Sequence, residues 1–551
     1  MKKSLLTLLS LTSLIAFSLT SCQKESVGTT TFEATLEDCQ DDDSKTAFTN
    51  GTMLWSTGDQ IKVFGTAGSG VYQATVRNNG RATFHCVSGD AGSAPYRAVY
   101  PASAANDDGT VELPVVQVTT DGSLTGFPMY AQGSSTNLDF KNLCGVLRLR
   151  LKKSGVSITA IEVMGDIELT GDYNVVYSGG VPTLQYSGHG TKTTMLTCST
   201  PQSIVNQKDF YIFLPVHTYS AGMRIRIYSS DGGVCTKTVT AGHSVDIRRG
   251  TITTIKLINT NSLTFTPNAG ALPGLFTIDN QGHQVRFSQG NLQYTTLGTH
   301  VVGTGGTEKG TWRFSSEQYE FIGDDNDNIS SIYTKWIDLF GWGTSGWNSG
   351  AICYQPWSFS TRDSDYDIGG SYTNDLTGAY AEADWAWHNA ICNGGNVAHQ
   401  WRTLTKDEWD YLFNIRTDAS SKYGIGNISG VPGMIILPDR WTLPSGCTFT
   451  SGLAPEECYY DWTLNNYTLA QWLLMEAAGA VFLPAAGFRY GNPTLGIINY
   501  PNYMYDGWYR SSGPYYDQEF VYIAYFSCEM LWTPSPADRN FGLSVRPVLD
   551  N

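Results

Sequence analysis

The chain has few charged residues and is especially short of basic ones. Only 15% of its 551 residues are charged, and 35 basic residues face 50 acidic ones, for a net charge of −15. Binding to nucleic acid or to an anionic membrane surface needs clustered cations. No basic run interleaved with aromatic residues occurs in the chain. The composition therefore argues against a nucleic-acid-binding protein and against a polybasic membrane patch.

Signatures of enzymes and of transition-metal sites are also missing. The 11 cysteines form no Cys-x-x-Cys pair, so zinc ribbons and thioredoxin chemistry lack support, and neither Gly-x-Ser-x-Gly nor His-Glu-x-x-His occurs. His388 and His399 flank Cys392 at a spacing that matches no recognised metal site, and we expect structural histidines there. Distant carboxylates can meet in space, so a glycosidase pair stays open. The prediction is that the protein is not an enzyme and needs no cofactor, with calcium left open below.

Long apolar runs are absent except at the start of the chain. Lys2 and Lys3 precede the apolar stretch Leu5 to Leu19, and Leu19-Thr20-Ser21-Cys22 follows at once. This order indicates a lipoprotein signal at residues 1–21 rather than a permanent transmembrane helix. The resemblance to such signals implies that Cys22 is acylated, whereas a plain secretory signal with an incidental cysteine is the alternative. We expect an outer membrane lipoprotein of the cell envelope, with residues 22–30 as a tether.

Aromatic and glycine residues are plentiful. Aromatic residues make up 13% of the chain, with 31 Tyr, and there are 58 Gly. This composition predicts a secreted, turn-rich protein that is mainly β, and the length predicts about three domains. The ten cysteines other than Cys22 lie on an export route where disulfides form, but their connectivity cannot be deduced.

Alternating apolar residues predict β-strands through the first half of the chain. Leu147, Leu149 and Leu151 alternate with two arginines, and the strand with Met223, Ile225 and Ile227 repeats this pattern. A hairpin is expected over residues 71–86, turning at Asn79-Gly80. With Tyr96 to Pro101, Leu113-Pro114, Pro128 to Tyr130 and Leu138 to Leu143 in this order, residues 30–258 resemble the fimbrillin family of type V pilus lipoproteins. The resemblance implies two transthyretin-like β-sandwich domains, at 31–152 and 153–258.

A polar linker at 259–262 leads to a different pattern. Thr405 and Glu408 form a capping box, and Trp409, Leu412 and Phe413 give the new helix one apolar face. A second helix is expected from Leu469 to Ala478, ended by Gly479. With Phe482 to Arg489, Gly507 to Ser512 and Gly542 to Val548 in order, residues 263–551 resemble the Fibrobacter-type major paralogous domain family. That resemblance implies an α+β, C-type-lectin-like fold, related to formylglycine-generating enzymes. The cysteine pair that holds their copper is missing, since only Cys528 follows Cys458.

Two acidic loops are candidates for calcium. The first places Asp324, Asn326 and Asn328 at alternate positions, and the second does the same with Asp363, Asp365 and Asp367. Such spacing lets one turn supply three of the six or more oxygens that calcium needs. Neither loop matches an EF-hand, because Ile329 and Ile368 stand where its glycine belongs. A hydrogen-bonded turn is the alternative for each loop.

The last candidate site is the Tyr- and Trp-rich run from Tyr500 to Tyr516. Exposed rings there offer flat apolar faces to sugar C–H groups. The predicted ligand-binding residues are Tyr505, Tyr515, Tyr516, Asp506 and Arg510, whereas Trp508 is expected in the core. Rings that fill the core of a helix-poor domain are the alternative for the whole run.

Together these patterns predict a lipid-anchored, adhesin-like protein of the cell envelope. The fimbrillin resemblance implies strand addition between pilus subunits or cell-surface proteins. A large domain follows where a C-terminal donor strand is expected, which favours a fimbrial tip or accessory subunit. The expected ligand is a glycan or another host-surface group. The alternative is a surface glycan-binding lipoprotein that assists nutrient uptake and belongs to no pilus.

Overall fold

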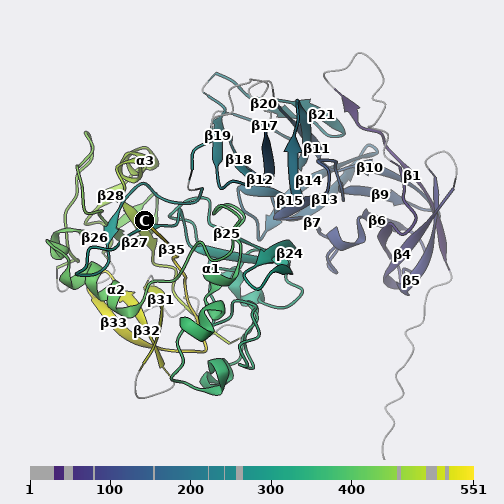
Figure 1. Ribbon diagram of the computed structural model, residues 1–551. Helices are drawn as coiled ribbons and strands as arrows, with labels where there is room; N and C mark the ends of the chain where they lie inside the picture. The colour runs from purple at the N-terminus through teal and green to yellow at the C-terminus, as the bar shows by residue number, and fades with distance from the viewer. Residues whose placement is uncertain are drawn as a thin grey trace, which may run out of the picture.

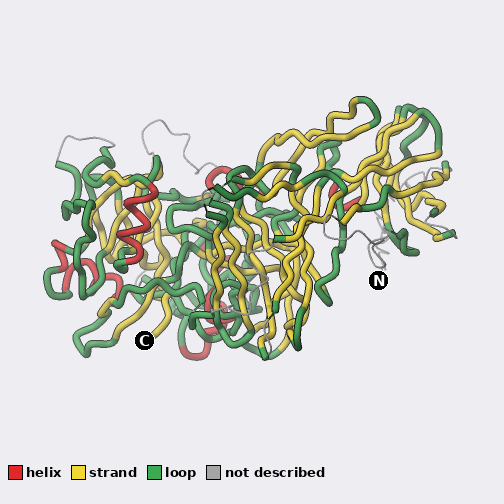
Figure 2. The backbone as a smooth tube through the Cα atoms, turned by 90° about the horizontal axis from the view of Figure 1, so that it is seen from above, coloured by secondary structure: helices red, strands yellow, loops and turns green. Residues whose placement is uncertain are grey.

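The computed structural model describes residues 30–41, 54–77, 81–152, 155–220, 222–240, 242–255, 265–267, 269–455, 461–491, 506–515 and 520–551. The protein is mainly β, as the composition predicted, and its strands fall into successive groups along the chain (Figure 1). Figure 2 shows the same grouping from above, with few helices among the strands and loops. No helix within the described ranges is long and apolar enough to cross a membrane.

The first group of strands closes on itself as a barrel. Its members, in spatial order, are β1 (Thr31–Leu36), β10 (Asn137–Asn142), β9 (Met129–Gly133), β6 (Tyr96–Tyr100), β3 (Gln60–Gly65), β4 (Gly68–Val76) and β5 (Ala82–Gly89). β1 closes the ring because it pairs in parallel with β10 and antiparallel with β5. The expected hairpin is present as β4 and β5, with Ala74 opposite Phe84. These strands therefore form a closed barrel, which differs from the β-sandwich that the fimbrillin resemblance implied.

The second group stacks two main sheets. One has the order β16 (Lys208–Leu214), β11 (Gly145–Leu151), β21 (Thr251–Thr254) and β2 (Gln40–Asp41). The other has the order β19 (Val234–Thr238), β18 (Arg224–Ser229), β12 (Val156–Met164), β15 (Thr193–Ile204) and β8 (Val116–Thr119). Smaller sheets are formed by β14 (Val181–Gly188), β13 (Gly171–Ser178) and β7 (Val111–Leu113), and by β17 (His217–Tyr219) and β20 (Val245–Ile247).

The chain before the boundary expected at residue 152 supplies strands to the second group. β11 lies before that boundary, yet it pairs with β16 and β21 of the second group. β2, β7 and β8 also come from the first part of the chain and pair with strands of the second. The three inward leucines of β11 are fully buried, as the alternation predicted.

Residues 265–551 form a third group of short strands joined by long loops. The strands are β22 (Phe276–Thr277), β23 (Gln284–Phe287), β24 (Leu292–Val302), β25 (Gly306–Phe314), β26 (Tyr423–Ile428), β27 (Val431–Ile436), β28 (Asn466–Tyr467), β29 (Val481–Pro484), β30 (Arg489–Tyr490), β31 (Gly507–Pro514), β32 (Phe520–Phe526), β33 (Leu531–Asp538), β34 (Phe541–Gly542) and β35 (Val548–Asp550). β35 pairs antiparallel with β23, so the end of the chain closes onto the start of this group.

Helices in the third group are short. The α-helices are α1 (Trp385–His388), α2 (Lys406–Asp410) and α3 (Leu469–Ala477). The described 3-10 helices of this group are η3 (Gly323–Asn328), η4 (Asp363–Tyr366), η5 (Ile368–Gly370), η6 (Gly378–Ala383) and η8 (Ala419–Ser421). Another, η1 (Ala102–Ala104), lies in the first group, and α2 continues as the π-helix η7 (Tyr411–Ile415). The capping box of Thr405 and Glu408 is present at α2, and Thr468 with Gln471 forms another at α3.

The third group packs on the outer face of the sheet that contains β18, β12 and β15. Arg226 on β18 pairs with Glu162 on β12 at 2.9 Å and donates to the Ser316 carbonyl at 3.0 Å. The guanidinium of Arg313 lies 4.1 Å from the ring centre of Trp336 and donates to Thr193 Oγ1 at 3.2 Å. A shared apolar cluster joins the two groups: Val115, Val116, Ala160, Met195 and Tyr228 from one, with Ala269, Trp336 and Cys392 from the other. This contact fixes the third group on the second.

Candidate functional site

Aromatic side chains line up across the sheet of β31, β32 and β33. Trp508 lies opposite Tyr525, and Tyr525 lies opposite Trp532. The ring centres of Trp508 and Tyr525 are 4.8 Å apart at 70°. Trp532 is 53% exposed, and the other two side chains are partly exposed. We call these three residues the aromatic rim.

The rim rests on two phenylalanines that hold its rings in place. Phe488 stacks on Phe541 at 4.9 Å, and Phe488 also contacts Trp508 at 5.1 Å. Offset and edge-to-face ring pairs of this kind stabilise by about 0.5–1.5 kcal/mol beyond the area they bury. Trp508 is therefore packed between Phe488 and Tyr525.

A carboxylate lies beside the rim. The hydroxyl of Tyr525 donates to Asp506 Oδ2 at 3.0 Å. Burial raises the pKa of Asp506 to about 6, although the hydrogen bond from Tyr525 acts in the opposite direction. Burial also raises the pKa of Tyr525, so its hydroxyl stays protonated as a donor. A flat ring next to a hydrogen-bonding carboxyl group is an arrangement that suits a sugar.

The structure separates the residues that the sequence proposed for ligand binding. Tyr505 and Tyr516 lie outside the described residues. Tyr515 is partly exposed and packs against Tyr522, with ring centres 5.0 Å apart. Asp506 lies at the rim, as described above.

Arg510 is a correction. Its side chain is fully buried and donates to the backbone carbonyls of Phe541, Arg539, Phe340 and Asp538. Four carbonyl partners and no exposed surface mean that it holds the loops of the third group together. The predicted contact between Arg510 and a surface ligand is therefore wrong.

Sequence reasoning proposed none of the three rim residues for binding. It expected Trp508 in the core, whereas the structure leaves this side chain partly exposed, and it stopped at Tyr516 without treating Tyr525 and Trp532. The stretch Phe520 to Phe526 is rich in β-branched and aromatic residues, which is the signal of a strand. That signal places Tyr525 in a strand, but its pairing with Trp508 follows only from the tertiary structure.

The first acidic loop is largely satisfied by protein contacts. Asn326 is fully buried, its Nδ2 donates to Asp338 Oδ1 at 2.8 Å, and its Oδ1 accepts from the Asp338 backbone at 3.0 Å. Asn328 Nδ2 donates to the Asp325 carbonyl at 3.5 Å. Burial, together with Asp327 and Asp325, raises the pKa of Asp324. These contacts are those of a hydrogen-bonded turn.

The second acidic loop anchors another loop of the chain. Asp363 Oδ1 accepts from the Asn540 backbone at 3.1 Å, and Asp367 lies 3.5 Å from Arg539. Asp365 Oδ2 accepts from Ser360 Oγ at 2.5 Å. Across the described ranges, no group of three or more His, Cys, Asp or Glu residues is placed to hold a metal ion. Calcium at either loop stays a prediction.

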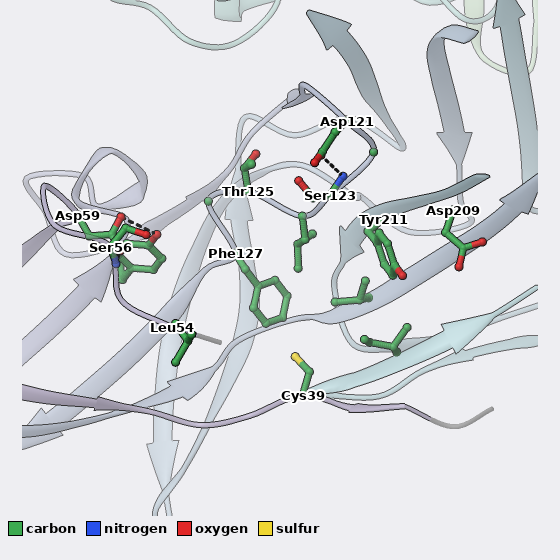
Figure 3. Close-up of a pocket in the computed structure, with 16 residues that line it drawn as sticks. Cys39, Leu54, Ser56, Asp59, Asp121, Ser123, Thr125, Phe127, Asp209 and Tyr211 are labelled. Atoms are coloured by element: carbon green, nitrogen blue, oxygen red, sulfur yellow. Dashed lines mark hydrogen bonds between the residues drawn. The ribbon is translucent and has the colours of Figure 1, made fainter. Parts of the chain in front are cut away.

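A cavity of about 720 Å³ lies where the first two groups of strands meet (Figure 3). Its wall carries the carboxylates of Asp59, Asp121 and Asp209 and the rings of Tyr100, Phe127 and Tyr211, and no lysine or arginine is among the described residues that line it. The three carboxylates already form hydrogen bonds or an ion pair within the protein. Asp121 accepts from the Ser123 backbone at 2.8 Å, and Asp59 does the same from Ser56 at 2.8 Å. Asp209 pairs with Arg150 at 3.0 Å.

Two further expectations concern single residues. Cys22, the predicted lipidation site, lies outside the described residues. Cys392 is buried with its Sγ 3.1 Å from Met195 Sδ, in the contact between the second and third groups. His388 and His399 instead meet at Glu382, with distances of 2.8 and 2.6 Å.

Comparisons with known proteins place the chain only weakly. No protein-family model and no curated protein sequence matches it. A solved structure of a protein assigned to cell adhesion from Bacteroides ovatus has a TM-score of 0.29 at 14% identity, over 44% of this chain and 96% of its own. Another such protein from Bacteroides fragilis has a TM-score of 0.25 at 12% identity, over 43% and 96%. The C-terminally truncated tip fimbrial protein Mfa3 from Porphyromonas gingivalis has a TM-score of 0.18 at 14% identity, over 38% and 82%. Each match spans less than half of this chain, and TM-scores this low assign neither fold nor function.

Proposed function

We propose that the protein is a lipid-anchored adhesin of the cell envelope, in which residues 265–551 present a glycan-binding surface. The observation that carries the proposal is the aromatic rim. Trp532 is 53% exposed although the strand pairing holds it in register with Tyr525. Exposing such a large apolar ring to water is unfavourable, and at this position the ring does not fill a core. Exposed aromatic residues of this kind are typical of binding surfaces.

The contact between the second and third groups supports an adhesive role. This contact covers Glu162 and Trp336, which are each 1% exposed. It also covers most of the Arg226 side chain, which is 15% exposed. A ligand-binding unit that is fixed to the rest of the chain transmits pulling force directly, which suits attachment to a surface.

The pairing of β35 decides whether this particular strand is free to be donated to a neighbouring subunit. Strand addition between subunits needs a strand that is free to leave its own fold. β35 pairs with β23 through Val548 and Phe287, and Val548 also bridges to Arg402. This strand is therefore engaged within the third group. The second candidate function is a glycan-binding lipoprotein without a pilus, and the aromatic rim is the observation that supports it.

The test is a glycan array probed with the full chain, with and without calcium. Three proteins are compared: the parent, Trp532→Ala at the rim, and Phe359→Ala as a control with a ring that is 44% exposed elsewhere in the third group. We expect Trp532→Ala to weaken binding roughly 5- to 30-fold, which corresponds to about 1–2 kcal/mol for a lost ring contact. Phe359→Ala should bind like the parent.

The outcomes separate the alternatives. Equal binding by the parent and Trp532→Ala would remove the rim as the site, and no binding to any glycan would remove glycans as the ligand class. Co-purification of the parent with pilus shafts would support the tip or accessory role. Glycan binding without any such association would support the nutrient-uptake alternative.

A further inference from the structure

Two histidines and two glutamates meet in the third group, away from the aromatic rim. We call Glu308, Glu382, His388 and His399 the Glu–His cluster. Glu308 lies on β25, Glu382 on η6, His388 at the end of α1, and His399 in the loop that follows. The loop at His399 is held in the left-handed region, with φ 63°. Three separate stretches of chain are thus joined through these side chains.

The protons of the cluster follow from the hydrogen bonds. Glu382 Oε2 lies 2.8 Å from His388 Nδ1, and Glu382 Oε1 lies 2.6 Å from His399 Nε2. A carboxylate accepts hydrogen bonds, so both imidazoles present an N–H to Glu382. His388 therefore carries its hydrogen on Nδ1 when it is neutral, and its Nε2 is left as a bare acceptor.

That bare nitrogen faces a second acceptor. His388 is fully buried, and its Nε2 has no hydrogen-bond partner among the described residues. Glu308 Oε1 lies 3.5 Å away. A buried polar atom without a partner destabilises the folded state, and two acceptors facing each other add repulsion. One proton between them would turn this contact into a charge-assisted hydrogen bond.

We propose that the Glu–His cluster is a pH-sensitive clip, in which His388 Nε2 takes up one proton from solvent and donates it to Glu308 in a hydrogen bond. The reaction adds one proton and forms one hydrogen bond, with no other bond broken. The clip joins α1 to β25 when the proton is bound and is released when it is lost. Mild acid therefore tightens this part of the third group.

Other charged groups packed around His388 do not compete for the same proton. Asp384, which caps α1, accepts from the Ala386 backbone at 3.0 Å and the Thr403 backbone at 2.8 Å. His300 on β24 lies 2.9 Å from the Gly310 carbonyl and 2.6 Å from Asn389 Oδ1. Burial lowers the pKa of His300. Glu308 and His399 form the exposed side of the cluster, with side chains that are 39% and 38% exposed.

The test uses the full chain and two readouts. The first is the ¹⁵N spectrum of the histidine side chains, with His388→Gln used to identify the His388 signals. We expect these spectra to show a hydrogen on His388 Nε2 when the clip is formed, as the contact with Glu308 requires. The second readout is the midpoint of thermal unfolding from pH 8 to pH 5, compared between the parent and Glu308→Gln.

Glu308→Gln separates the clip from a merely structural histidine. The glutamine amide donates to neutral Nε2 at any pH, so the variant keeps the contact without the proton. We expect the parent to gain roughly 2 °C relative to Glu308→Gln on going from pH 8 to pH 5. The control His283→Gln removes a histidine that is 68% exposed beside Asp279 and should not change this difference.

Two results would overturn the proposal. One is a His388 Nε2 that stays unprotonated down to pH 5. The other is a thermal profile of Glu308→Gln that runs parallel to the parent at every pH.

Discussion

Asp506 accepts a hydrogen bond of 3.0 Å from the Tyr525 hydroxyl at the edge of the aromatic rim. Burial raises the pKa of the Asp506 carboxyl from 3.8 to about 6. The folded state therefore binds a proton more tightly than the unfolded state does. The stability that this carboxyl contributes is present at low pH and is lost as the pH rises from about 4 to about 6.

The first prediction follows from this loss of stability as the pH rises. Asp506→Asn keeps an acceptor for Tyr525 but cannot ionise, so it avoids the cost of a buried charge. The unfolding midpoint of the variant relative to the parent should rise between about pH 4 and about pH 6 and level off above that range. Asp461→Asn is the control of opposite sign, because hydrogen bonds from Thr463 lower the pKa of Asp461. A difference for Asp506→Asn that does not vary with pH would contradict the prediction.

The local features of the fold could be predicted from the sequence. Apolar alternation assigned the buried faces of β11 and β18 correctly, because side chains in a strand point alternately to its two faces. The capping box of α2 was also predicted, since Thr405 and Glu408 lie three residues apart in one turn. These signals depend on neighbours in sequence.

Pairing between distant residues could not be predicted. The alternation placed Arg226 away from the core of its own sheet, but nothing near it in sequence shows that Glu162 and Ser316 cover that face. The closure of the barrel by β1, β5 and β10 could not be predicted for the same reason, because these strands lie far apart in the sequence. At the site, the sequence found Asp506 but misjudged Arg510, because a charged residue next to aromatic ones does not reveal its burial.

The second prediction concerns the buried ion pair between Arg226 and Glu162. Glu162→Gln removes the nearer of the two carboxylates that face Arg226, in a contact where Glu162 is 1% exposed, and leaves Glu317 at 3.5 Å. Breaking a buried pair from one side costs about 3–5 kcal/mol, and the remaining carboxylate of Glu317 places the expected loss toward the lower end of this range. Denaturant unfolding of the full chain should show this loss. Asp107→Asn, which removes the 98% exposed partner of Lys62, should cost under about 1 kcal/mol.

An equal effect of the two substitutions would contradict the prediction. It would mean that the contact between the second and third groups is solvated in solution.

The third prediction concerns the anchor. Cys22→Ser should leave the chain without lipid, because a serine hydroxyl cannot form the thioether link. Cells that express the parent or the variant are labelled with a fatty-acid probe, and the labelled protein is then isolated. Cys39→Ser is a control that keeps Cys22. Undiminished label in Cys22→Ser would exclude Cys22 as the anchor.

The fourth prediction concerns Arg510, which holds four backbone carbonyls together inside the third group. Two effects oppose each other in Arg510→Met. Removing the guanidinium removes the free-energy cost of burying its charge, the same burial that lowers the pKa of Arg510 to about 9. Each carbonyl that is left without a donor, however, costs about 1–3 kcal/mol. Four carbonyls lose a donor while one charge is removed, so the net result should be a loss of roughly 3–5 kcal/mol. Denaturant unfolding measures it, with the exposed Arg440→Met expected within about 0.5 kcal/mol of the parent. A variant at Arg510 as stable as the parent would mean that the loops of the third group hold their positions without this side chain.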